Sequence, residues 1–397
     1  MNPPGINPHF LAAGVAAFFL AACLFSHTVA LRLLLLIAGI GLAVFVITQD
    51  RHAARTVPPL WLPFLLWGAW AALSWAWSSE PDRTAKEWRN EIGYVAAAFW
   101  VCFIAAQAPR SARIILPVFG AAAVLVCAVA LYHFPNGNGW HGGAGNLSST
   151  LLTLMPCAMM AAWHARRSGW NRSVQWACFL LAILLAVSAY TTLNRTVWLG
   201  FALQFLVMGA LLLRRARIVP NNRTTMIGAA AALAIVAGAT VMTLGVQAER
   251  EVAGARSLSE DPRFALWLEI FERIEARPLT GYGFGRGALR ESLRTELDDR
   301  TLWHSHNLLL DVAIQLGLAG LALLLFLLAA TVREGWRLAR DRSDAAAACG
   351  IALIAVLAGM LMRNMTDVLW VRQNALLYWG VAGVLLAWGS TQRSSSN

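Results

Sequence analysis

Long apolar stretches separated by short polar loops make up most of the chain. A run of about 17–25 predominantly apolar residues can cross a bilayer as a helix. In lipid its backbone N–H and C=O groups find no water, so they must hydrogen-bond to each other within the helix. The candidate spans lie at about residues 10–29, 31–49, 58–77, 92–108, 113–133, 147–164, 174–192, 196–213, 226–246, 306–330, 345–362 and 374–390. The pattern therefore predicts an all-α integral membrane protein with about 12 transmembrane helices.

One large polar insertion, residues 247–305, interrupts this pattern and carries nine arginines and eleven acidic residues. It divides the chain into spans 1–9 (1–246), the insertion, and spans 10–12 with a short tail (306–397). We expect a helical insertion, because Ser259 and Pro262 are typical of a helix start.

The apolar residues of this helix recur at helical spacing. They are Phe264, Trp267, Leu268, Phe271 and Ile274. The spacing predicts an amphipathic helix lying on the membrane surface or on the helix bundle.

A glycine-rich run, residues 279–287, follows this helix. It lacks the strand and helix of a dinucleotide-binding turn. We therefore expect a backbone packed closely against the bundle.

Charge follows topology in this chain. The composition is 58% hydrophobic and 13% charged, and the pI is near 10.2. In a soluble protein such a pI would suggest binding to nucleic acid. Here the basic residues lie mainly in short loops between spans, so membrane topology explains the charge better. One set of loops holds sixteen basic residues: Arg51, Arg55, Arg110, Arg113, Arg166, Arg167, Arg172, Arg214, Arg215, Arg217, Arg223, Arg333, Arg337, Arg340, Arg342 and Arg393. The opposite short loops hold seven: Arg32, Arg83, Lys86, Arg89, Arg195, Arg363 and Arg372. The positive-inside rule then places both termini in the cytoplasm and the insertion in the periplasm.

Two arginines are candidate anion ligands. Arg195 lies between two apolar spans, where a charge must snorkel, pair or bind a ligand. Arg263 lies in the first turn of the amphipathic helix, where an anion would gain both the guanidinium and free backbone N–H groups. A solvated surface position is the alternative for Arg263. Four further charged residues lie in other loops on the same face and could extend a basic cavity around an anionic ligand or form surface pairs; they are Arg89, Arg363, Asp367 and Arg372.

His304 and His306 permit three interpretations. On an extended segment both side chains point the same way, which would suit a metal. The candidate co-ligands show no ligand spacing, so no metal is predicted; these are His133, His141, Asp298 and Asp299. If His306 opens the tenth span, it could be a neutral general base. The third interpretation is a capping or interfacial histidine.

Three motifs occur in an order that resembles the O-antigen ligase/polymerase superfamily. They are Asn194-Arg195-Thr196, the stretch from Arg263 to Pro278-Leu279-Thr280-Gly281-Tyr282-Gly283, and His306-Asn307 followed by Leu316-Gly317-Leu318-Ala319-Gly320. The chain departs from the family pattern at Arg277, where the family has Asn, and at Gln315, where an acidic residue is frequent.

The resemblance implies a GT-C type glycosyltransferase of lipopolysaccharide biosynthesis in the bacterial inner membrane. The donor would be a glycan on undecaprenyl diphosphate, and the acceptor would be lipid A–core at the periplasmic face. The mechanism would be inverting and independent of metals and cofactors. By position, Arg195 and Arg263 would bind the diphosphate and His306 would activate the acceptor hydroxyl, with His304 as an alternative or supporting residue.

Alternative functions remain open on the sequence. One dominant insertion favours an O-antigen ligase over a polymerase, while protein O-oligosaccharyltransferases share the motifs. A secondary transporter is the alternative from another class. It would place charges near the bilayer midplane, whereas here they gather at one face.

Overall fold

The computed structural model describes residues 7–50, 56–108, 110–134, 143–216, 263–286, 304–368 and 370–394, with Gly238, Val241, Arg290 and Leu293. Within this part of the chain the regular elements are helices, without a strand. The longer helices are α1 (Pro8–Cys23), α2 (Val29–Gln49), α4 (Trp61–Leu73), α6 (Tyr94–Ala106), α7 (Ala112–His133), α8 (Gly143–Arg167), α9 (Arg172–Tyr190), α10 (Arg195–Arg215), α12 (Arg263–Ala276), α14 (Leu308–Ala339), α15 (Asp344–Asn364) and α16 (Arg372–Ser394). Between α4 and α6 lie η1 (Ser74–Trp77), α5 (Pro81–Trp88) and the short π-helical turn η2 (Arg89–Gly93).

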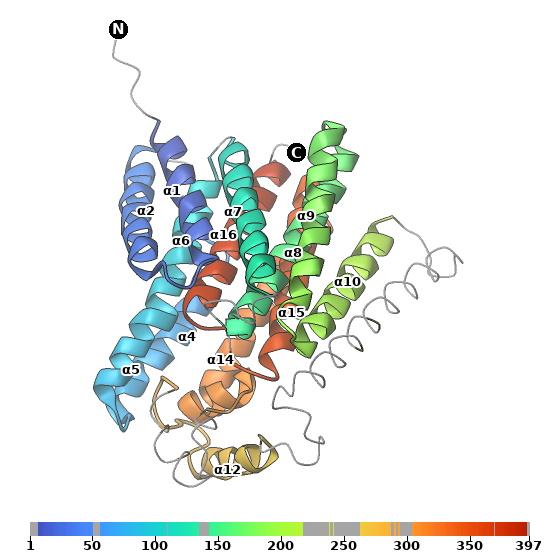
Figure 1. The fold of residues 1–397 in the computed structure, drawn as a ribbon. Coiled ribbons are helices and arrows are strands. Elements are labelled where there is room, and N and C mark those ends of the chain that lie inside the picture. Colours follow the sequence, from blue (N-terminus) through green and yellow to red (C-terminus); the bar gives the residue numbers. More distant parts are fainter. Residues whose placement is uncertain are drawn as a thin grey trace.

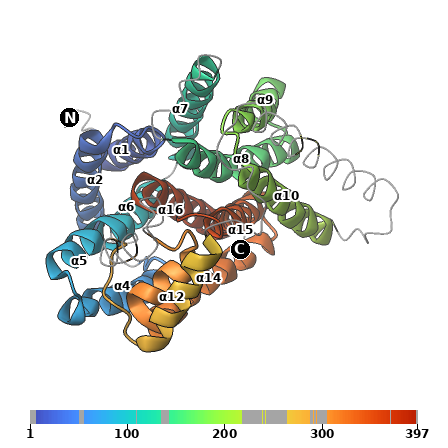
Figure 2. The ribbon, with the colours of Figure 1, turned by 60° about the horizontal axis from the view of Figure 1, so that its bottom comes forward.

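Helix α15 is central to the bundle. It packs against α8, α10, α14 and α16, and α16 in turn packs against α6 (Figures 1 and 2). Its small residues permit close approach, since a Cβ on Gly350 or Gly359 would meet atoms of α14 or α10. The alanine- and glycine-rich sequence of α15 therefore explains its central position.

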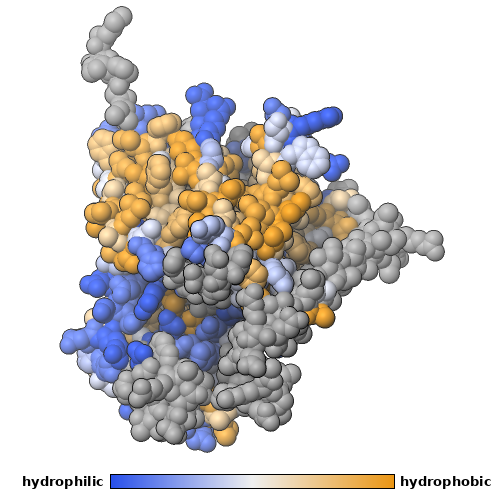
Figure 3. All heavy atoms as spheres, in the orientation of Figure 1, coloured by the Kyte–Doolittle hydropathy of each residue, from blue (hydrophilic) through white to orange (hydrophobic). Residues whose placement is uncertain are grey.

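The described helices coincide with every predicted span except 226–246, which lies outside the described residues apart from Gly238 and Val241. Six of the described helices are long and apolar enough to cross a membrane, namely α2, α7, α9, α10, α14 and α15. On the face that Figure 3 shows, apolar side chains form a band across the bundle, with polar residues above and below it. The protein is thus a multi-pass helical membrane protein, and the number of 12 spans remains a prediction.

The candidate chemistry gathers at one end of the bundle. The first turn of α1 and the last turn of α16 lie at one end, and α12, the start of α14 and the end of α15 lie at the other (Figure 1). This arrangement agrees with termini on one side and the insertion on the opposite side. Which side faces the periplasm remains a prediction.

Helix α12 lies across the start of α14 (Figure 2). The sequence left open whether this helix lies on the membrane surface or on the bundle, and in the structure one of its faces contacts the bundle. Leu266, Ile270 and Ile274 pack against α14, whereas Leu268 and Phe271 are 64% and 51% exposed. The helix carries apolar residues on two faces, so spacing alone could not identify the one that α14 covers.

The glycine-rich run packs tightly against a break in α14. Gly317 has a φ of 67° inside that helix, which leaves nearby carbonyl groups without helical donors. The backbone N–H groups of Tyr282 and Gly283 donate to the carbonyls of Ile314 and Gln315, at 3.1 and 2.9 Å. A Cβ on Gly281 (φ 62°) would lie 2.5 Å from the Gln315 carbonyl. The expected close backbone packing is confirmed.

Candidate active site

A tight turn places His304 and His306 at the start of α14. Asn307 is the N-cap, and its side chain accepts from the backbone N–H groups of Leu309 and Leu310. His306 has a φ of 50°, a left-handed conformation that costs about 1–3 kcal/mol in a residue other than glycine. The His304 Nδ1 atom accepts from the His306 backbone N–H at 3.1 Å, and the two rings lie 4.0 Å apart between centroids. The cap and this hydrogen bond fix the histidine pair.

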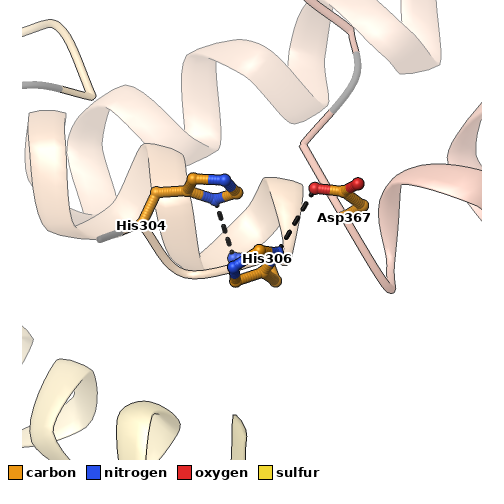
Figure 4. Close-up of side chains that lie close together, drawn as sticks. All are labelled: His304, His306 and Asp367. Atoms are coloured by element: carbon orange, nitrogen blue, oxygen red, sulfur yellow. Dashed lines mark hydrogen bonds and ion pairs between the residues drawn. The ribbon is translucent and has the colours of Figure 1, made fainter. Parts of the chain in front are cut away.

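Asp367, in the loop after α15, faces His306 (Figure 4). The distance from Asp367 Oδ1 to His306 Nδ1 is 3.3 Å. A carboxylate at Nδ1 favours the tautomer protonated there, which leaves Nε2 as the basic nitrogen. The arrangement is an imidazole oriented by a carboxylate, a geometry that suits a general base.

A buried arginine supports the same carboxylate. Arg363 is 4% exposed, and its Nη2 atom lies 3.7 Å from Asp367 Oδ2. Its other donors reach Ser148 Oγ at 3.4 Å and Thr366 Oγ1 at 3.3 Å. Burial raises the pKa of Asp367, but the His306 hydrogen bond and the Arg363 charge outweigh it and lower this pKa to about 2. Asp367 is therefore ionised at neutral pH.

A hydrogen bond joins helix α12 to the histidine turn. Trp267 Nε1 donates to the Ser305 carbonyl oxygen at 2.8 Å. The helix that begins at Arg263 thus lies beside the two histidines. The side chain of Arg263 is outside the described residues, so its role remains a prediction.

The other predicted arginines lie at several positions around this end. Arg195 is exposed at the first residue of α10, where Asn194 caps the helix by accepting from the Thr196 backbone N–H. Arg89 is exposed in η2, and Arg372 is exposed at the start of α16. The structure brings Arg363 to Asp367 but does not bring Arg89 or Arg372 into a described contact with the histidines.

The Arg372 segment is held through its backbone. Its N–H donates to Glu91 Oε2 at 2.7 Å. Burial raises the pKa of Glu91 to about 7. This contact joins η2 to the beginning of α16.

One group of side chains could hold a metal ion. Ligand atoms of His304, His306 and Asp367 lie within 4.8 Å of one another. The sequence did not indicate Asp367 as the third ligand, because Asp367 is distant along the chain and only the fold brings it close to the histidines. The signal for Asp367 was weak: an acidic residue four positions after Arg363 at the end of a span.

Residues 180–325 match the O-antigen ligase family. The matched segment extends from α9 through α10 and α12 into α14, and therefore contains Arg195, Arg263, His304 and His306. No curated protein matches the chain. The family match over this segment, together with the motif order, supports the resemblance to the O-antigen ligase/polymerase superfamily.

Proposed function

We propose that the protein is an O-antigen ligase, a GT-C type glycosyltransferase of the inner membrane that moves a glycan from undecaprenyl diphosphate to lipid A–core. The observation that carries the proposal is the His306–Asp367 pair at the end of the bundle that bears α12. It lies partly within the segment that matches the O-antigen ligase family. A base at the start of a helix, at the end of the bundle that bears α12, would meet a sugar hydroxyl from one lipid and a diphosphate from another.

The chemistry is one inverting displacement. His306 Nε2 accepts the proton of the acceptor hydroxyl while the oxygen attacks the anomeric carbon of the donor. The bond from that carbon to the diphosphate oxygen breaks, and undecaprenyl diphosphate leaves with the electron pair. Asp367 stabilises the imidazolium that forms, because its carboxylate faces Nδ1.

The leaving diphosphate needs positive charge at the moment of cleavage. Arg195 at the start of α10 and Arg263 at the start of α12 would supply it. Both helices contact elements of the histidine site, since α10 packs on α15 and α12 packs on α14. The proposal assigns diphosphate binding to these two arginines and orientation of the Asp367 loop to Arg363.

Reconstitution tests the proposal. The purified protein in liposomes receives lipid-linked glycan with either lipid A–core or only further donor molecules. Transfer to lipid A–core supports a ligase, whereas lengthening of the donor glycan would instead identify a polymerase. A protein acceptor in a third reaction tests for protein O-oligosaccharyltransferase activity. Absence of transfer in all three reactions, with protein shown to be folded, would contradict the assignment.

A further inference from the structure

A buried carboxylate that the proposed mechanism does not use lies directly behind the histidine turn. Asp311, in the first turn of α14, is 5% exposed. Its Oδ2 atom accepts from Gln315 Nε2 at 2.8 Å, and its Oδ1 atom lies 3.1 Å from Ser305 Oγ. Ser305 stands between the two histidines, so Asp311 contacts the turn that presents the base.

The cation of Arg286 faces the same place. Arg286, His304, Asp311 and Gln315 line one cavity of about 20 Å³. An unpaired buried charge is costly, so a carboxylate is retained at such a position when a cation and hydrogen bonds compensate it. Gln315 completes the cluster, because its Oε1 atom accepts from the Gly285 backbone N–H at 2.8 Å. The cluster ties the glycine-rich run to α14.

Arg286 also contacts the loop that carries Asp367. Its Nη1 atom donates to the Val368 carbonyl oxygen at 2.9 Å. Val368 directly follows Asp367 in the chain. One side chain of the insertion therefore lines the cavity behind the histidine turn and holds the loop that carries the carboxylate.

We propose that Arg286 and Asp311 are positioning residues that set the separation of His306 and Asp367. Asp311 holds the chain at Ser305, one residue before the base, and Arg286 holds it at Val368, one residue after the carboxylate. Both side chains line the same cavity, so they join the two segments through it. This inference rests on the proposed function and adds a role for the glycine-rich run.

The first test removes the cation. Arg286→Met should lower kcat about tenfold to a hundredfold, because a displacement near 1 Å in a reacting group costs that much. KM for both substrates should stay within about twofold, since neither residue contacts substrate. Arg277→Met is the matched control: Arg277 precedes the same run, is exposed, and stacks over Tyr282 with its guanidinium carbon 4.7 Å from the ring centroid. It should retain the wild-type kcat.

The second test moves the negative charge by one helical turn. Asp311→Asn alone leaves Arg286 uncompensated and should lower kcat by a similar factor. The double variant Asp311→Asn with Gln315→Glu restores one carboxylate to the cavity, keeps an acceptor for the Gly285 N–H, and should recover most of the lost kcat. A purely structural loss of packing would not be rescued by this exchange.

The possible outcomes distinguish a failure of the proposed function from a failure of the positioning role of Arg286 and Asp311. Wild-type protein without transfer activity contradicts the proposed function. Wild-type transfer that Arg286→Met leaves at full kcat overturns the positioning inference alone, as does a double variant no better than Asp311→Asn. If Asp311→Asn does not fold, Arg286→Met and the double variant still decide the question.

Discussion

Two aspartates lie at the two ends of α15 and differ in the side chains that they contact. Asp344 is the first residue of the helix, and Asp367 lies shortly after its last residue, Asn364. Both side chains are 29% exposed, so burial does not distinguish them. Asp344 faces two arginines, Arg167 at 3.2 Å and Arg215 at 2.8 Å.

Among the residues that the structure describes, the second aspartate has one arginine partner. Asp367 faces Arg363 on one oxygen and the imidazole of His306 on the other. The Asp344 cluster joins α8, α10 and α15 with permanently charged groups and can do no more than clamp them. The Asp367 cluster includes an imidazole, a side chain that can serve as a general base. The comparison teaches that the identity of the partner distinguishes a carboxylate that clamps helices from one that belongs to the proposed active site.

Removing the partner that distinguishes the two clusters should have the largest effect. His306→Ala should reduce transfer by about 10²–10⁴-fold, because a general base contributes about that much. The protein should still insert and keep its thermal transition, since His306 is only half-buried. His304→Ala should retain partial activity, because His304 accepts one backbone hydrogen bond from His306. Full activity of a purified His306→Ala protein would exclude it as the base.

Neutralising each aspartate tests the comparison directly. Asp367→Asn should cost about tenfold to a hundredfold in kcat, because the imidazole loses the group that orients it and stabilises its charge. Asp344→Asn is the matched control at the opposite end of the helix and should leave kcat unchanged. Its expected cost is a small drop in Tm, since partly exposed ion pairs contribute about 0–1 kcal/mol. Equal losses of kcat in both variants would show that the two clusters are both structural.

The arginines of the diphosphate site should matter next. A charge-assisted contact to phosphate is worth about 1.5–3 kcal/mol, so Arg195→Ala and Arg263→Ala should each cut transfer by about one to two orders of magnitude. Lysine should rescue only partly, because it lacks the planar bidentate fork. Binding of undecaprenyl diphosphate to each variant is the deciding measurement. If both bind it as tightly as the wild type, the diphosphate site must be sought near Arg89, Arg363 or Arg372.

Much of the fold could be predicted from hydropathy alone. Apolar runs must be helical in lipid, so described helices such as α14 and α15 lie where the sequence predicted spans. The buried face of α12 was less predictable, because this helix has apolar residues on two faces and only one of them can pack against α14. The face with Leu268 and Phe271 has the expected spacing, yet α14 covers the other one.

The candidate site was predictable only where its residues are close in sequence. His304 and His306 are two positions apart, and their place before an apolar run marks a helix start. The partnership of His306 with Asp367 spans 61 positions and depends on how α14 and α15 pack. Arg286 gave no signal, because an arginine in a glycine-rich loop is normally a solvated surface residue.

The response to metal ions should be the smallest effect, and it sharpens the difference between the two aspartates. Transfer should survive EDTA unchanged, since protonation of His306 and the charges of Arg195 and Arg263 suffice for the displacement. Added Zn²⁺ should nevertheless inhibit, because His304, His306 and Asp367 offer ligand atoms within 4.8 Å of one another and Zn–N bonds are about 2.0–2.1 Å long. Asp344, which faces Arg167 and Arg215, offers no such set. EDTA should reverse the inhibition, and titration of the purified protein with Co²⁺, followed by visible absorption, should show a signal that Asp367→Asn weakens and Asp344→Asn does not. Loss of transfer in EDTA, restored by Zn²⁺, Mn²⁺ or Mg²⁺, would contradict the metal-independent mechanism and make the two histidines and Asp367 ligands of a catalytic ion.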